Sequence, residues 1–293
     1  MDRDAVDAVR SFNRLVTQRV GALGDHYLAR DRPLGASRVL WEIGPDGADV
    51  RGLRARLDLD SGYLSRLLRS LEADGLMTVE TSGTDARVRI ACLTRAGQAE
   101  WRLLDQRSDE LAESMLDPLN ESHRARLVAA MGEVELLLTA ALVEVAPVDP
   151  THRHAQHCLA AYFADLDERF ETGFDPDAAL PIDLDALRPP VGTFLVATLR
   201  GEPVGCGALK HGGAEPPEVK RMWVSPTARG LGIGRRLLTE IEDLARANGN
   251  RRIRLDTNAT LTEAIALYRT AGYEETAPFN DEPHASRWFE KRL

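Results

Sequence analysis

The segment Glu218–Leu238, EVKRMWVSPTARGLGIGRRLL, runs from a strand-like stretch through a glycine loop into a basic helix that carries leucines. Its three glycines stand at alternate positions, which leaves the backbone N–H groups of the loop unshielded. The helix that follows adds the positive end of its dipole, so the loop favours binding of an anionic phosphate without a lysine. The rest of the sequence indicates which phosphate compound this is.

Two common nucleotide-binding patterns do not fit the loop. A P-loop places Lys and then Ser or Thr after its last glycine, whereas Gly234 is followed by Arg235. A dinucleotide fingerprint needs G-x-G-x-x-G, and the sixth position counted from Gly230 is again Arg235. Asp256 imitates the ribose-binding acid of that fold, but the loop follows the third expected strand of its domain and not the first.

Length and composition point to a soluble protein of two domains. A chain of 293 residues is long for one domain, and 43% hydrophobic and 28% charged residues are ordinary values for globular proteins. The N-terminus is charged from Asp2, which argues against a secretory signal, and we expect a cytoplasmic protein without membrane contact. The three cysteines, Cys92, Cys158 and Cys206, form no C-x-x-C pair, so neither a disulfide framework nor a zinc site is indicated.

A linker is expected where two prolines follow a leucine-rich helical run. The segment VEVAPVDPTH, Val143–His152, has this pattern. It divides the chain into domains over 1–145 and 153–293, joined by a linker over 146–152. Each half carries more acidic than basic residues, so any contact with DNA must rest on a local patch.

The two halves differ in their hydrophobic periodicity. The first half is mainly helical, with amphipathic runs over 6–23 and 127–142 of the kind that pair with another copy. The second half alternates strands and helices, as an α/β domain with a mixed central sheet does. Its strands are expected over 193–199, 204–210, 218–224, 252–257, 273–276 and 286–291, and its helices over 232–248 and 260–271.

A helix-turn-helix is predicted from the two short helical patterns over 50–57 and 60–74. Asp60 is a plausible N-cap of the second helix, and Gly75 is a plausible stop. Leu64, Leu67, Leu68 and Leu71 form its inward stripe. The residues left outward suit a DNA major groove: Ser61, Gly62, Tyr63, Ser65, Arg66 and Arg69. A helical dimerisation domain with a solvated arginine face remains an alternative.

A β-hairpin over 77–94 follows, with its turn at Ser82-Gly83 and with Arg87 and Arg89 near its tip, where they can reach the minor groove or the DNA backbone. Its sequence DARVRIACLTRAG resembles the D-x-R…L-T-x-x-G wing signature of the MarR family. The residues that match are Asp85, Arg87, Leu93, Thr94 and Gly97. The resemblance covers 1–145 and implies a winged helix-turn-helix homodimer that binds double-stranded DNA, with Asp85 orienting Arg87.

The glycine loop also carries a resemblance. Arg229, Gly232 and Gly234 form R-x-x-G-x-G after a strand ending MWVSP, which is similar to the acetyl-CoA signature of the GNAT acetyltransferases. The resemblance covers about 150–293. It implies that acetyl-CoA is held by Met222, Val224, Arg229, Gly230, Leu231, Gly232, Ile233, Gly234, Arg235 and Asn258. The alternative is that the glycines only form a tight turn between strand and helix and bind no ligand.

Acetyl transfer to an amine needs a base for the amine proton and an acid for the departing thiolate. The GNAT resemblance assigns these roles to Glu218 and Tyr268. Glu218 could instead be a carboxylate paired with Lys220 or Arg221, and Tyr268 could simply pack on the sheet. A backbone N–H near Met222 would polarise the acetyl carbonyl.

The acceptor end of the site is expected at Asn280, Asp281, Glu282 and His284, whose acidic members favour a cationic amine. His152, His154 and His157 straddle a helix start without a completing ligand, so no metal is expected. The combined hypothesis is a DNA-binding regulator that is also an acetyl-CoA-dependent N-acetyltransferase. Two alternatives stay open: a regulator that only senses acetyl-CoA, and an enzyme whose winged helix is a scaffold.

Overall fold

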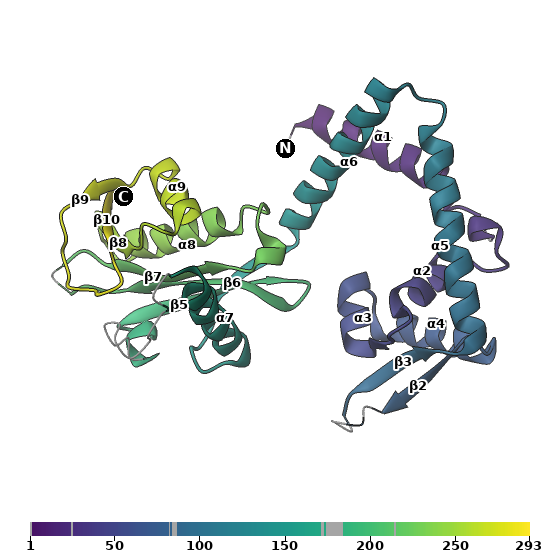
Figure 1. The fold of residues 1–293 in the computed structure, drawn as a ribbon, viewed down its shortest axis with the longest axis horizontal. Helices are drawn as coiled ribbons and strands as arrows, with labels where there is room; N and C mark the ends of the chain where they lie inside the picture. Colours follow the sequence, from purple (N-terminus) through teal and green to yellow (C-terminus); the bar gives the residue numbers. More distant parts are fainter. Residues whose placement is uncertain are drawn as a thin grey trace. The chain divides into compact units, whose positions relative to one another are not determined.

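The computed structural model describes residues 2–24, 26–81, 83, 87–170, 173, 184–213 and 215–293. The chain divides into two compact units, Met1–Ala130 and Met131–Leu293, which are described separately (Figure 1).

The first unit is a helical bundle with a small antiparallel sheet of three strands, in the order β1-β3-β2. Its helices are α1 (Arg3–Arg19), η1 (Tyr27–Ala29), α2 (Leu34–Ile43), α3 (Val50–Leu57), α4 (Ser61–Ala73), α5 (Arg95–Leu116) and α6 (Glu121–Ala141), the last of which runs on into the second unit. Its strands are β1 (Ala48–Asp49), β2 (Met77–Thr81) and β3 (Arg89–Leu93). The first helix ends earlier than its apolar periodicity suggested, because Gly21 takes a positive φ of 69°.

Helices α3 and α4 are separated by a short turn whose acidic residues have defined tasks. The Asp60 carboxylate accepts a hydrogen bond from the Tyr63 N–H at 2.8 Å, which confirms the predicted N-cap. Asp58 takes the left-handed conformation with a φ of 49° and ends α3. The inward stripe is also confirmed, because Leu64, Leu68 and Leu71 are buried and Leu67 packs against the same core.

The hairpin β2–β3 is joined to α5 by a close backbone crossing. The Thr94 hydroxyl donates to the Gly75 carbonyl at 2.7 Å and accepts from the Gly97 N–H at 3.1 Å. A Cβ on Gly97 would clash with the backbone of Leu76, so the crossing requires glycine. The hairpin turn at Ser82 and the predicted wing residue Asp85 lie outside the described residues.

The second unit is built on a mixed sheet of seven strands, in the order β4-β5-β6-β7-β8-β10-β9. The strands are β4 (Val143–Pro147), β5 (Gly192–Leu199), β6 (Glu202–Lys210), β7 (Glu218–Val224), β8 (Arg252–Thr257), β9 (Glu274–Thr276) and β10 (Arg287–Arg292). The helices are α7 (Arg153–Arg169), η2 (Leu184–Leu187), η3 (Pro226–Ala228), α8 (Ile233–Ala247) and α9 (Thr262–Thr270). The predicted strands and helices of this half are confirmed to within a few residues.

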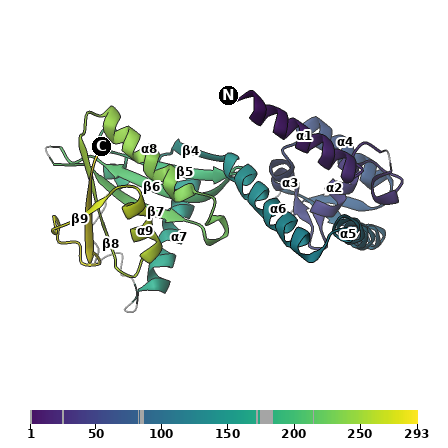
Figure 2. The same cartoon turned by 90° about the horizontal axis from the view of Figure 1, so that it is seen from above.

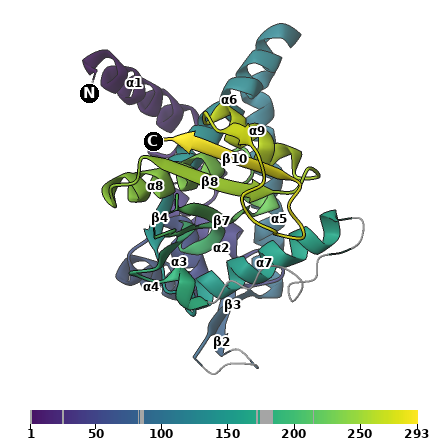
Figure 3. The ribbon, with the colours of Figure 1, turned by 90° about the vertical axis from the view of Figure 1, so that its left-hand side faces the viewer.

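Alternate side chains of the sheet pack into two separate hydrophobic cores. Leu195 and Ala197 of β5 join the core under α8 and α9, whereas Phe194 and Val196 join the core under α7. Helix α8 therefore lies across one face of the sheet and α7 covers the other (Figures 1 and 2). In Figure 3, β8 runs beside β10, its antiparallel partner.

The first residues of the expected linker over 146–152 belong to a strand. Strand β4 continues to Pro147 and pairs with β5, and the Val148 N–H still donates to the Phe194 carbonyl at 2.9 Å. Pro147 is tolerated because β4 is an edge strand, and no neighbouring strand on its outer side accepts a backbone hydrogen bond. The boundary between the compact units falls earlier, within α6.

Strand β7 contains an irregularity that opens the sheet. Cys206 pairs with Trp223 and Ala208 pairs with Lys220, so two residues of β7, Arg221 and Met222, face one residue of β6. Such a bulge bends its strand and leaves the extra residue outside the ladder. On its other side β7 is in parallel register with β8 at Glu218 and Arg254 alone, and the two strands diverge beyond that point.

In the described part of the chain, no helix combines the length and the apolar character needed to cross a lipid bilayer.

We predict that Gly97→Ala destabilises the first unit, because the new methyl group meets the Leu76 backbone, which cannot move as a flexible side chain would. The expected loss is about 1–3 kcal/mol, measured by thermal unfolding followed by circular dichroism. Gly132→Ala is the matched control: this helical glycine has no atom near its missing Cβ, so the variant should be as stable as the parent or slightly more so. Equal melting curves for the two variants would contradict the close crossing.

Candidate functional site

A continuous cleft lies in the second unit where β7 and β8 diverge. Two adjoining cavities form it, and α7, β7 and α9 contribute to both. The residues common to both cavities are Tyr162, Leu166, Met222, Leu261, Ala264 and Tyr268. One cavity, here called the loop-side cavity, extends to Val224, Arg229 and Gly234, and the other, the Asp256-side cavity, extends to Asp256, Asn258, Glu282 and His284.

The glycine loop is shaped to receive an anion. Gly230 and Gly232 have φ values of 87° and 72°, which other residues rarely adopt, and open space surrounds the position of each missing Cβ. Gly232 is the N-cap of α8 and supplies no side-chain cap, so the N–H groups of the first turn keep their donor capacity. Ile233 is buried in the core, so it can contribute its backbone but not its side chain. The residues present fit a phosphate group bound by backbone amides.

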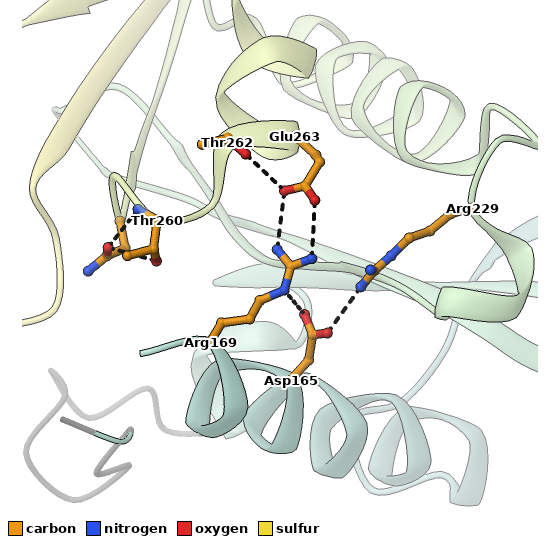
Figure 4. Close-up of polar contacts among 7 residues, drawn as sticks. Asp165, Arg169, Arg229, Thr260, Thr262 and Glu263 are labelled. Atoms are coloured by element: carbon orange, nitrogen blue, oxygen red, sulfur yellow. Dashed lines mark hydrogen bonds and ion pairs between the residues drawn. The ribbon is translucent and has the colours of Figure 1, made fainter. Parts of the chain in front are cut away.

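The arginine of the loop belongs to an ion-pair network that joins three elements (Figure 4). Arg229 contacts the Asp165 carboxylate of α7 at 3.0 Å, and Arg169 contacts the same carboxylate at 3.5 Å. Arg169 also reaches Glu263 of α9 at 3.3 Å. All four residues line the loop-side cavity. Asp165, Arg169 and Glu263 could not be found from the sequence, because ion-pair partners on three separate elements leave no local signal.

Tyr268 is placed at the junction of the two cavities. It lies on α9, is 5% exposed, and lines both of them. Its ring packs against Tyr273 and Phe289 at centroid distances of 5.9 Å and 6.2 Å. Burial raises the pKa of Tyr268 well above that of an exposed tyrosine, so the phenol stays protonated at neutral pH.

Glu218 lies at the start of β7 and is held by two cations. Lys220 and Arg254 each contact its carboxylate at 3.0 Å, whereas Arg221 does not pair with it. Burial raises the pKa of Glu218, but the charges and hydrogen bonds of Lys220 and Arg254 outweigh burial and hold it below its ordinary value. Glu218 is not among the residues that line the two cavities. Glu218 is therefore an ion-paired carboxylate in this structure. Its partner Arg254 is one that the sequence did not indicate.

Asp256 lies in the wall of the Asp256-side cavity, a position that the sequence did not indicate. It pairs with Lys220, and its carboxylate accepts a hydrogen bond from the Asn280 amide at 3.0 Å. Lys220 thus bridges Asp256 to Glu218. Burial lowers the pKa of Lys220, but the two carboxylates raise it by more, so the lysine stays charged. The available signal for Asp256 was an acidic side chain near the end of the expected strand RIRLDT.

The other predicted residues of the acceptor end separate into two groups. Glu282 and His284 line the Asp256-side cavity. Asn280 does not line it but donates a hydrogen bond to Asp256, and Asp281 is exposed. Asn258 lines the same cavity and ties two loops together. Its amide donates to the His284 carbonyl at 2.8 Å and its oxygen accepts from the Thr260 N–H at 3.0 Å.

Of the remaining predicted residues in the cofactor set, Met222 and Val224 line the cleft, and Leu231 packs against the core. The Arg235 side chain donates to the Thr270 hydroxyl of α9. Tyr162 also lines the Asp256-side cavity, as do Lys220 and Arg221, which the sequence indicated only as partners of Glu218.

The predicted DNA-reading residues of α4 are exposed, whereas its leucines Leu64, Leu68 and Leu71 are buried. Ser61, Gly62, Tyr63, Ser65, Arg66 and Arg69 are exposed, as are Arg87 and Arg89 of the hairpin. The Arg66 guanidinium lies 5.6 Å from the Tyr63 ring, and Arg69 donates to the Ser65 carbonyl at 3.2 Å. The first unit thus presents an exposed patch of arginine, tyrosine and serine, here called the α4 patch.

The histidine cluster has a structural task. The His152 ring accepts a hydrogen bond from the His154 N–H at 3.2 Å and caps α7. Within the described ranges, no group of three His, Cys, Asp or Glu side chains is arranged to hold a metal ion.

The chain is similar to known acetyltransferases over its second half. Residues 159–273 match the sequence family described as the acetyltransferase (GNAT) family. The IAA acetyltransferase of Azospirillum brasilense is 42% identical over 127 residues, which are 42% of this chain and 82% of that protein. The N-alpha-acetyltransferase RimI of Mycobacterium tuberculosis is 34% identical over 127 residues, 42% of this chain and 75% of that protein.

Among solved structures, an acetyltransferase of the GNAT family from Staphylococcus aureus aligns with a TM-score of 0.44 and 20% identity, over 52% of this chain and 99% of that one. The glycine loop fits a bound phosphate, and the sequence relatives are matched over most of their length. The chain therefore belongs to the GNAT family, and its second unit is an acetyl-CoA-dependent N-acetyltransferase.

Proposed function

We propose that the cleft transfers an acetyl group from acetyl-CoA directly to an amine, with the donor entering from the glycine loop and the acceptor from the Asp256 side. The observation that carries this proposal is the continuity of the cleft from the uncapped first turn of α8 past Met222 and Tyr268 to Asp256. The N–H groups of residues 229–235 bind the pyrophosphate, and the diverging edge of β7 beside Met222 and Val224 holds the pantetheine arm.

The reaction requires one bond to form and one to break. Bound acetyl-CoA supplies the thioester, whose carbon–sulfur bond breaks as the acceptor nitrogen bonds to the acetyl carbon. The bulge at Arg221 and Met222 leaves a backbone N–H of β7 outside the ladder with β6, where it can donate to the acetyl oxygen. The amine nitrogen loses one proton and the leaving sulfur gains one, so no covalent enzyme intermediate is needed.

Asp256 takes the amine proton in this proposal, and Glu218 acts through Lys220. The Asp256 carboxylate lines the cavity, whereas Glu218 does not, and the two cations beside Glu218 lower its pKa and make it a weaker base. The predicted role of Glu218 thus becomes one of positioning: it shares the Lys220 ammonium with Asp256.

Tyr268 gives the proton to the leaving sulfur. Because burial raises its pKa, the phenol remains protonated where an ordinary tyrosine with a pKa of about 10 would ionise. We predict that kcat reaches a plateau on the alkaline side and does not decline as the pH passes through this ordinary value. Tyr268→Phe should lower kcat by about 10²-fold or more while acetyl-CoA affinity, measured by calorimetry, stays unchanged.

Tyr273→Phe is the matched control, because Tyr273 is a buried neighbour that does not line the cleft, and its activity should equal that of the parent. Asp256→Asn should lower kcat more than Glu218→Gln does. If no acceptor is acetylated by the parent faster than acetyl-CoA hydrolyses, and Tyr268→Phe changes nothing, a domain that only senses acetyl-CoA is favoured instead.

A second function is favoured by the α4 patch. We propose that the first unit is a winged helix-turn-helix, in which α4 enters the major groove of DNA and the β2–β3 hairpin contacts the minor groove. The small residues Ser61 and Gly62 at the start of α4 permit close approach, and Arg66 and Arg69 are exposed and project from the same side as Ser65. Both arginines can pair with guanine or phosphate.

The DNA-binding form is proposed to be a homodimer. None of the residues of α1 or α6 is buried, although both helices carry apolar side chains. On α1, Val9, Phe12 and Val16 recur at helical spacing and are 58%, 45% and 37% exposed. An apolar helix face of this kind is stabilised by a second copy of the chain, and a dimer also supplies two recognition helices for a symmetric operator.

We predict that Arg66→Ala combined with Arg69→Ala weakens binding to DNA from upstream of the protein's own coding sequence. Removing phosphate contacts should also flatten the dependence of affinity on salt by about one unit of slope per contact. Arg252→Ala, an exposed arginine of the second unit, is the control and should bind as the parent does. Phe12→Glu should give monomers in sedimentation and weaker binding. Undiminished binding by the double variant would show that the α4 patch does not read DNA.

A further inference from the structure

Arg221 occupies an unusual position in the wall of the cleft. It is one of the two β7 residues at the bulge, and its φ of 56° is in the left-handed region that residues with side chains seldom adopt. The Cys206 thiol donates to the Arg221 carbonyl at 3.2 Å, which helps to hold the bulge. Nothing in the neighbouring sequence predicts this left-handed conformation at Arg221.

The Arg221 guanidinium is held by two aromatic rings of α7. It lies 4.9 Å from the Phe163 ring centroid and 5.6 Å from that of Tyr162, and the two rings are inclined at 54° to each other. Cation–π contacts of this kind use the face of the guanidinium. One N–H of the guanidinium also takes part in a hydrogen bond with the Tyr162 hydroxyl. Because a guanidinium has five N–H donors, others remain for a carboxylate or a phosphate.

The charge of Arg221 is not neutralised within the described residues. No Asp or Glu of that part of the chain lies within ion-pair distance of Arg221. The other cation of the same wall, Lys220, is shared by two carboxylates. The Asp256-side cavity thus contains Arg221, which is held by two rings and keeps N–H donors for a ligand. The neighbouring acid, Asp256, is already paired with Lys220.

Coenzyme A is not the expected partner of this charge. Arg221 lines the Asp256-side cavity and does not line the loop-side cavity, where Arg229 and Gly234 lie. The pyrophosphate of the proposed donor is bound at the loop, so an anion at Arg221 has to come from the acceptor.

We propose that the acceptor is an amine that carries a carboxylate, as amino acids do, and that the Arg221 guanidinium binds this carboxylate while the amine faces Asp256. The inference rests on the proposed function, because it assigns the acceptor end of the same cleft. It replaces the expectation of a purely cationic acceptor drawn from Asp281 and Glu282. Asp281 is exposed, and Glu282 shares the cavity with two cations.

The test compares each of the standard L-amino acids with its primary amide and with the corresponding decarboxylated amine, as acceptors for the full-length protein with acetyl-CoA. We expect at least one amino acid to be acetylated with a kcat/KM about tenfold or more above that of its amide, corresponding to about 1.4 kcal/mol. Arg221→Gln should abolish this preference, mainly by raising KM for the acid, so that kcat/KM for the acid falls to the value for its amide. Arg221→Lys should restore part of it, because a lysine keeps the charge but not the fork.

The matched control is Arg200→Gln. Arg200 is also at positive φ, 53°, but lies in the exposed turn between β5 and β6. This variant should retain the parent's preference, and circular dichroism confirms that each variant is folded. Binding of the N-acetyl-amino acid product, measured by calorimetry without acetyl-CoA, should weaken about tenfold in Arg221→Gln and stay unchanged in Arg200→Gln.

Three results overturn the inference. In the first, the parent acetylates amides or decarboxylated amines as well as it does the acids. In the second, Arg221→Gln keeps the preference for the acid. In the third, no amino acid is acetylated although calorimetry shows that acetyl-CoA binds. Failure of acetyl-CoA to bind at all would instead remove the proposed function, and the inference with it.

Discussion

The second unit depends on two residues of β7 facing one residue of β6. Arg221 and Met222 oppose Gly207, and a side chain on Gly207 would press on Met222 and on Ile241 of α8. The left-handed conformation of Arg221 costs about 1–2 kcal/mol, which the packing of Met222 and the Cys206 hydrogen bond offset. Because the bulge bends β7, the strand leaves β8 after Glu218, and a cleft opens where a regular sheet would be closed.

The charges around the cleft follow from this opening. On the Asp256 side, two carboxylates and two cations form a partly buried network in which each group has an opposite partner. On the loop side, Arg169 and Arg229 share Asp165, and Arg169 continues to Glu263, so α7 and α9 are linked across the cavity. These pairs are partly exposed and contribute little stability. Their effect is to orient side chains. Among the described lysines and arginines of the cleft, Arg221 is the one without a carboxylate within ion-pair distance.

Much of this organisation is encoded locally and could be predicted. The glycine loop, the strand before it, and the cap and leucine stripe of α4 are each decided by residues within one or two turns. The bulge could not be predicted, because it depends on the register between β6 and β7. The same limit applies to Arg254, the partner of Glu218, which comes from a neighbouring parallel strand. It also applies to the cavity positions of Asp256 and Tyr162, which depend on the placement of β8 and α7.

The central claim is that the first turn of α8 holds the phosphates of the donor. Hydrogen exchange of the backbone amides of residues 230–235, with and without coenzyme A, tests it most directly. In the free protein these amides should exchange quickly, because Gly232 provides no side-chain cap, and bound coenzyme A should slow them. Binding of coenzyme A that leaves the exchange of these amides unchanged, while it protects another segment, would contradict the account.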